Sequence, residues 1–185
     1  DKKKYDWTQY WSSVTTGSKM VAYLDDKTVG NTPRLKEFKA RGLVTRAYAY
    51  SYLMENYQDS YLQGGMDRLG IMLYDYYSPL QPYKARSTST ETWDFIKDDL
   101  NTAIGLFGEA GVGITTKNIT DIDLAVSNFL LARASLITGD WATAISACDA
   151  ILSKYSTRMG DNVYGGTRNV SQKREPEIGA ETNEM

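Results

Sequence analysis

The side chains in this sequence with the most evident binding chemistry are its tyrosines. There are 14 of them, and nine fall between Tyr48 and Tyr83. A tyrosine ring offers flat apolar area that can stack on the C–H face of a sugar ring, and its hydroxyl can bond to sugar hydroxyls. Nearby amides and carboxylates add hydrogen bonds that orient such a ligand. The residues predicted to bind a saccharide are Tyr61, Gln63, Tyr74, Asp75, Tyr76 and Tyr77.

The sequence lacks the side chains that most catalytic and metal sites need. It contains no histidine and one cysteine, Cys148. This excludes Ser-His-Asp and Cys-His pairs, imidazole metal ligands and an intrachain disulfide. A glycosidase would need two carboxylates about 5–10 Å apart across a cleft, whereas the adjacent Asp98 and Asp99 would point about 100° apart on a helix. We therefore expect no enzymatic activity, no metal and no cofactor.

Charge and hydropathy narrow the range of partners. The formal net charge is −2 and the isoelectric point is near 5.2. The lysines and arginines are scattered, which argues against a nucleic acid partner. No apolar run approaches the roughly 20 residues that a membrane-spanning helix requires.

One long helix, over residues 35–58, is expected to position the other elements. Its apolar side chains form two stripes, so neighbouring elements must cover it on two sides. Residues 58–89, called here the tyrosine loop, have no helical period, but their aromatic content predicts an ordered segment. Further helices are predicted over residues 8–24, 89–108, 121–138 and 141–155.

Several residues are predicted to begin or end these helices. Thr88 and Glu91 have the spacing of a capping box. Gly108 stands where a left-handed C-terminal cap would lie, and Gly139 is expected to end the fourth helix. Either Thr120 or Asp121 is predicted to begin that helix.

The helical spacing also predicts which polar and aromatic side chains are buried. Arg46 lies among apolar neighbours, and a buried arginine normally needs a carboxylate partner. Asp98 and Asp99 are both candidates for that role. The aromatic residues predicted to pack in the core are Trp7, Trp11, Tyr48, Tyr50, Tyr52, Trp93 and Trp141.

Four short motifs occur in a characteristic order between residues 39 and 152. They are RAYAY at 46–50, RST at 86–88 followed by WDFIKDDL at 93–100, ARASL at 132–136, and GDW at 139–141. Together they resemble the motifs of the SusD/RagB family, the surface glycan-binding lipoproteins of Bacteroidetes. Each motif is short, so the specificity of the resemblance comes from their order.

The resemblance implies an all-α, tetratricopeptide-like scaffold with a ligand face built from loops. It implies a protein that binds an oligosaccharide or polysaccharide in nutrient uptake, together with a SusC-like TonB-dependent outer-membrane transporter. It also implies an outer-membrane, surface-exposed lipoprotein held by a lipidated N-terminal cysteine. Cys148 is predicted to lie within a helix, so we expect that anchor to lie outside this sequence.

The predicted organisation has two parts. Residues 1–155 are expected to form a SusD-like N-terminal helical domain, and residues 156–185 an irregular segment leading toward a C-terminal portion. A different function remains open, that of a helical-repeat scaffold that docks a protein partner without binding sugar. An apolar groove between helices, rather than exposed tyrosines on a loop, would favour that alternative.

Overall fold

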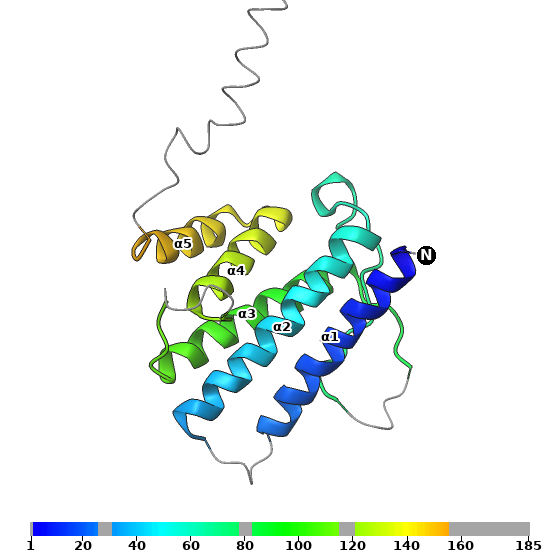
Figure 1. Cartoon of the computed structure of the whole chain (residues 1–185). Helices are drawn as coiled ribbons and strands as arrows, with labels where there is room; N and C mark the ends of the chain where they lie inside the picture. Colours follow the sequence, from blue (N-terminus) through cyan, green and yellow to red (C-terminus); the bar gives the residue numbers. More distant parts are fainter. Residues whose placement is uncertain (1, 26–30, 78–82, 115–120, 156–185) are drawn as a thin grey trace, which may run out of the picture. The chain divides into compact units, whose positions relative to one another are not determined.

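The computed structural model describes residues 2–25, 31–77, 83–114 and 121–155. Within these ranges the chain is helical, and its only strand-type pairing is an isolated bridge between Leu69 and Thr88. The all-α prediction is confirmed, while the predicted irregular segment 156–185 lies outside the described residues. None of the described helices combines the length and apolarity needed to cross a membrane. The elements are α1 (Lys2–Asp25), α2 (Pro33–Tyr57), the 3-10 turn η1 (Tyr61–Gln63), α3 (Ser89–Glu109), α4 (Leu124–Thr138) and α5 (Trp141–Leu152) (Figure 1).

The central position predicted for the long helix is confirmed for α2. It packs on α1 along one side and on α3 along another, while α4 packs on α3 and pairs with α5 (Figure 1). Both predicted apolar stripes supply buried residues. The buried apolar residues of α2 are Ala40, Leu43, Val44, Ala47, Ala49, Tyr50, Leu53 and Met54.

Two glycines allow α1 and α2 to approach closely. A Cβ atom at Gly17 would lie 2.7 Å from the carbonyl oxygen of Gly42, and one at Gly42 would lie 3.0 Å from the Cβ of Met20. Any larger residue at position 17 would therefore push the two helices apart. Gly17 weakens α1 as an isolated helix, but it is required at this crossing.

The helix ends agree with local capping chemistry, with two corrections. The capping box is present, because the Thr88 hydroxyl accepts from the Glu91 N–H and the Glu91 carboxylate accepts from the Thr88 N–H. Gly108 does not cap α3 but lies inside it, and Gly111 takes the left-handed conformation with φ +70°. The cap of α4 is Asp123 and not the predicted Thr120 or Asp121, because the Asp123 carboxylate accepts from two N–H groups of the first turn.

The structure corrects two predicted core positions, Tyr48 and Trp141, and also exposes Ile145 beside the second. Tyr48 is 47% exposed on α2, and Trp141 and Ile145 on α5 are 58% and 62% exposed. Helix α5 packs mainly on α4, and the residues it buries are small, Ala144 and Ala147. The side of α5 turned away from α4 lacks a described neighbour that would bury its larger residues.

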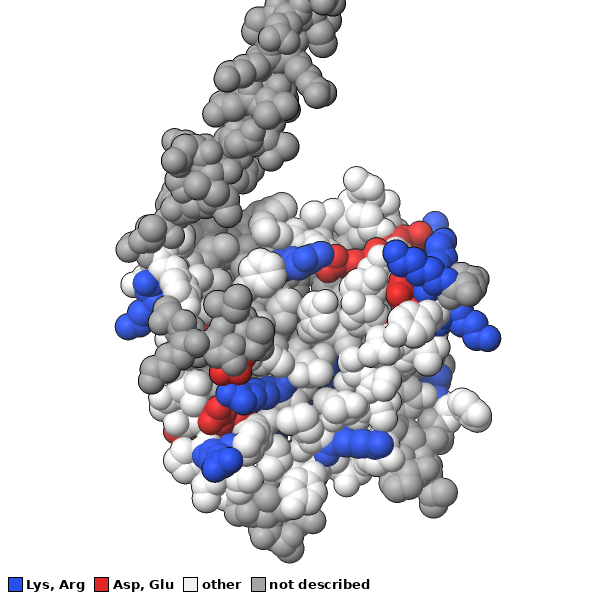
Figure 2. Space-filling model, in the orientation of Figure 1, with Lys and Arg blue, Asp and Glu red and all other residues white. Residues whose placement is uncertain are grey.

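Ion pairs connect neighbouring helices at the surface. The Lys36 ammonium lies 2.7 Å from a Glu109 carboxylate oxygen, linking α2 to α3, and Arg133 of α4 pairs with Glu55 of α2. On the face shown in Figure 2, acidic and basic side chains mostly lie side by side on a largely uncharged surface. Exposed pairs of this kind contribute about 0–1 kcal/mol each, so core packing dominates the stability.

Candidate functional site

The tyrosine loop is held against α2 by a buried tyrosine hydroxyl. Tyr50 donates to the carbonyl oxygen of Met72 at 3.2 Å and accepts from the N–H of Tyr74 at 2.9 Å. Its side chain is fully buried, and burial raises its pKa well above the ordinary value. The hydroxyl therefore keeps its proton and makes both hydrogen bonds at once.

A buried arginine holds the next residue of the loop. Nε and Nη2 of Arg46 each donate to a carboxylate oxygen of Asp99 at 2.7 Å, and Nη1 donates to the backbone carbonyl of Asp75 at 2.8 Å. Of the two predicted partners, the structure selects Asp99. Burial raises the pKa of Asp99, and the hydrogen bonds from Arg46 partly oppose that rise. The family-type RAYAY motif thus supplies both groups that hold the loop to α2.

Helix α1 makes a third connection to the same segment. The hydroxyl of Ser18, which is buried, donates to the carbonyl oxygen of Tyr74 at 3.1 Å. Residues 72–75 are therefore bonded to two helices, and both backbone polar groups of Tyr74 have partners. This fixes the backbone that carries Tyr74 and its neighbours.

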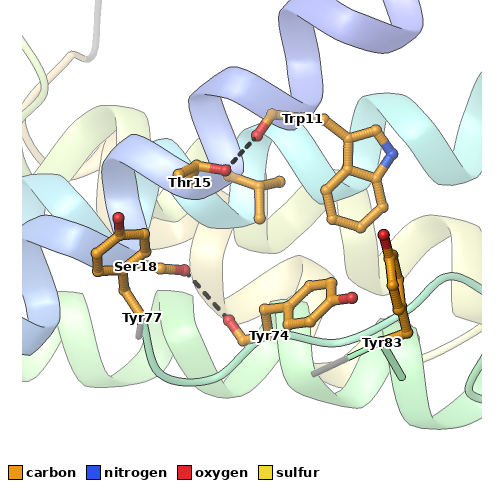
Figure 3. Close-up of a pocket in the computed structure, with 7 residues that line it drawn as sticks. Trp11, Thr15, Ser18, Tyr74, Tyr77 and Tyr83 are labelled. Carbon is orange, nitrogen blue, oxygen red and sulfur yellow. Dashed lines mark hydrogen bonds between the residues drawn. The ribbon is translucent and has the colours of Figure 1, made fainter. Parts of the chain in front are cut away.

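These connections create an open hollow between α1 and the tyrosine loop, called here the α1 hollow. Its volume is about 240 Å³. Trp11 contacts Tyr74 edge to face, with ring centroids 5.9 Å apart, and Tyr83 stands fully exposed at 104%. Figure 3 shows these three rings close to one another, with Tyr77 on the opposite side. The lining includes Trp11, Thr15, Ser18, Tyr74, Tyr77 and Tyr83.

Charged groups lie at the edge of the α1 hollow. The Lys19 ammonium lies 4.8 Å from the centroid of the Tyr77 ring, and that of Lys84 lies 5.7 Å from the centroid of Tyr74. Lys84 also bonds to the Asp75 carboxylate at 3.0 Å, which lowers the pKa of Asp75. The hollow supplies apolar ring area with phenol and hydroxyl groups, and its edge adds ammonium and carboxylate groups, a mixture that suits a polyhydroxylated ligand.

The structure does not gather all six predicted ligand residues in one place. Tyr74 and Tyr77 line the α1 hollow, and Asp75 lies beside it in the ion pair with Lys84. Tyr76 is 59% exposed but does not line the hollow. Tyr61 and Gln63 belong to η1. Tyr61 is nearly buried there, with its hydroxyl 3.2 Å from Thr90 Oγ1, and Gln63 is exposed.

Two aromatic residues of the hollow were not among the predicted ligand residues. Trp11 has the helical spacing of a core residue, and its ring does pack against the core. It nevertheless lines the hollow, and its indole N–H is buried with no hydrogen-bond partner among the described residues. Tyr83 belongs to the tyrosine-rich stretch, so its residue type could have identified it as a candidate ligand residue.

The sequence of this chain matches a known protein family. Residues 1–117 match a SusD-like family model described as "Starch-binding associating with outer membrane". Because the match covers more than half of the chain, the protein belongs to the SusD-like family. No curated protein matches the chain significantly.

Solved structures share the fold. A SusD-like carbohydrate binding protein from Bacteroides vulgatus ATCC 8482 is similar with a TM-score of 0.70 and 20% identity, over 85% of this chain and 32% of that one. A SusD superfamily protein from Bacteroides thetaiotaomicron VPI-5482 gives 0.72 and 18%, over 83% and 33%. Surface glycan-binding protein A from Bacteroides uniformis gives 0.63 and 15%, over 84% and 33%. This chain thus spans about a third of the length of each solved relative.

Proposed function

We propose that this chain is the N-terminal helical part of a SusD-like protein that binds an oligosaccharide or polysaccharide through the α1 hollow. The observation that carries the proposal is the way the loop is held. Tyr50, Arg46 and Ser18 bind the backbone of residues 72–75, and four aromatic side chains then line one open hollow. In this proposal residues 1–155 are the helical domain, and 156–185 lead toward a C-terminal portion.

The size of the hollow limits how much ligand it holds. Pockets for whole small molecules typically measure about 300–1,000 Å³, whereas the α1 hollow measures about 240 Å³. It therefore takes one or two sugar rings of a longer chain. Trp11 and Tyr83 would contact the apolar ring faces, while Tyr77 and Lys84 would bond to hydroxyl groups.

The proposed activity is binding without bond cleavage. Glycoside hydrolysis uses a pair of carboxyl groups facing the scissile bond. Among the described residues, those that line the α1 hollow include neither aspartate nor glutamate, and the nearby Asp75 is paired with Lys84. This arrangement suits retention of a glycan rather than its hydrolysis.

The proposed cellular setting is nutrient uptake at the outer membrane. The matched family model carries the description "associating with outer membrane", which supports that location. The proposal is that the protein acts there as a surface-exposed lipoprotein. In this setting the bound glycan passes to a SusC-like TonB-dependent transporter.

Affinity electrophoresis tests sugar binding directly. The protein is run through native gels that contain starch, xylan, mannan or pectin, beside Tyr83→Ala and a matched control, Tyr23→Ala. Tyr23 is 68% exposed on α1 and does not line the hollow. We expect one glycan to retard the wild type and Tyr23→Ala but not Tyr83→Ala. Equal retardation of all three proteins, or of none in any gel, would reject binding in the α1 hollow.

One observation favours the alternative of partner docking without sugar contact. An almost wholly apolar groove of about 340 Å³ lies between α2 and α4. Its exposed residues include Tyr48 and Phe129, at 47% and 56%. If this groove docks the transporter, Phe129→Asp will weaken co-purification with it and leave the retardation by glycan unchanged.

A further inference from the structure

The second predicted group of ligand residues, around Tyr61, borders a hollow of its own. This hollow, called here the η1 hollow, lies between the end of α2, η1, α3 and α4 and measures about 350 Å³. Its floor contains Met54, Tyr61 and Trp93, which are 2%, 9% and 2% exposed. Its rim contains Glu55, Gln58, Asp59 and Ser60. None of these residues lines the α1 hollow.

The rim of the η1 hollow is held in place by several contacts. The carbonyl oxygen of Ser60 accepts from the N–H groups of Gln63 and Gly65, at 3.1 and 3.0 Å. A Cβ atom at Gly65 would lie 2.6 Å from the carbonyl oxygens of both Asp59 and Ser60, so this tight turn requires glycine. The Tyr61 hydroxyl, 3.2 Å from Thr90 Oγ1, fixes the floor beneath it.

The charges of the rim are balanced. Glu55 is paired with Arg133, whose Nε lies 3.0 Å from Oε1 of Glu55. Arg86 donates to Oε1 of Gln58, which leaves the amide NH₂ of Gln58 available as a donor. The rim thus carries two carboxylates, Glu55 and Asp59, and two guanidinium groups bond to rim residues from outside the lining. This balance suits an uncharged ligand that offers many hydroxyl groups more than it suits a free ion.

We infer that the η1 hollow is a second saccharide site, one that takes an uncharged sugar unit. The inference rests on the proposed saccharide function for its ligand class, but it concerns different residues. The Asp59 carboxylate accepts from sugar hydroxyls, and the Gln58 amide and Ser60 hydroxyl donate to them. The partly buried Ile137 and the accessible edge of Tyr61 contact the C–H face of the ring.

Nuclear magnetic resonance distinguishes the two sites. The ¹⁵N-labelled 185-residue chain is titrated separately with maltohexaose, xylohexaose and mannohexaose, and backbone amide shifts are followed at Ser60 and at Tyr77. The variants are Asp59→Ala for the η1 hollow and Tyr83→Ala for the α1 hollow. Asp67→Ala is the matched control, because Asp67 is an exposed carboxylate on the same loop and does not line either hollow.

We expect one of the probes to shift both amides. Asp59→Ala should weaken the binding reported by Ser60 roughly tenfold, the usual effect of losing a hydrogen bond to a charged group, and leave Tyr77 unchanged. Shifts at Tyr77 alone, or equal effects of Asp59→Ala and Asp67→Ala, would overturn the second site while leaving the proposed function standing. Shifts at Ser60 alone would support the second site and overturn binding in the α1 hollow. No shift with any probe would overturn both.

Discussion

Removing the hydroxyl of Tyr50 should loosen the tyrosine loop without disturbing the helices. In Tyr50→Phe the ring still fills its fully buried position, but the Met72 carbonyl and the Tyr74 N–H lose their partner. A typical hydrogen bond contributes about 0.5–1.5 kcal/mol net, and an unsatisfied buried group costs about 1–3 kcal/mol. Because both backbone groups are only partly buried, we expect a loss of about 2 kcal/mol.

The size of this loss sets the expected melting temperature. For a chain of this length 1 kcal/mol corresponds to roughly 2–4 °C, so Tyr50→Phe should melt roughly 4–8 °C below the wild type. Amide hydrogen exchange adds a local readout, because the Tyr74 N–H is protected by the Tyr50 oxygen. Its exchange should accelerate by at least tenfold, and retardation by the bound glycan should weaken.

The control is Tyr23→Phe, which removes the hydroxyl of a 68% exposed tyrosine. This variant should match the wild type in melting temperature and in Tyr74 exchange. Unchanged exchange of the Tyr74 amide in Tyr50→Phe would refute the reasoning, because the hydroxyl would then not be what holds the loop. A general rise in exchange over α2 and α3 would instead point to damage in the core.

Three further predictions concern stability. Arg46→Met should lower the free energy of unfolding by about 3–5 kcal/mol, because it leaves the buried Asp99 carboxylate without its partner; an effect below 1 kcal/mol in urea unfolding would contradict this. Gly17→Ala should cost about 1–3 kcal/mol by forcing helices apart, whereas Gly108→Ala, in open space within α3, should stabilise by up to about 1 kcal/mol. The last prediction concerns Glu91, whose hydrogen bonds to Thr88 lower the pKa of its carboxyl group in the folded state. Glu91 therefore stabilises the fold above its unfolded pKa, and this stabilisation is lost as the pH falls through the folded pKa. Glu91→Gln should lower the urea midpoint at pH 7 and have little effect at pH 3.

The secondary structure could be predicted where the signal is local. The capping box at Thr88 and Glu91 needs only residues three apart, and the two apolar stripes of α2 follow from the helical period. The errors in the predicted helix ends amount to a few residues. Gly108 and Gly111 are both suitable residues for a left-handed cap, and the sequence does not specify at which of them α3 stops.

The buried ion pair could be predicted only as a requirement. A buried arginine needs a carboxylate, but Asp98 and Asp99 are adjacent on the third predicted helix, and either could face Arg46. The rotation of α3 against α2 turns Asp99 inward and leaves Asp98 exposed. That rotation results from the packing of whole helices, so local sequence does not decide between the two residues.

For the candidate binding residues, too, the sequence indicated the residue type but not the position in the fold. The sequence indicated tyrosines on a loop, and Tyr74 and Tyr77 do line a hollow. It did not indicate that Trp11 would join them, because Trp11 lies on a helix far earlier in the chain. Nor did it indicate that Tyr61, the first residue of η1, would be nearly buried and would border a different hollow.

By itself, the sequence determined the all-α class, the central helix, the capping box, the shortage of catalytic side chains and the family resemblance. These depend on composition and on neighbours within one or two helical turns. Only the tertiary structure decided which aromatics share a hollow and that Tyr50, Arg46 and Ser18 hold the loop. It also decided that Tyr48 and Trp141 stay exposed. Such outcomes depend on contacts between distant segments, whose geometry arises only when the helices pack together.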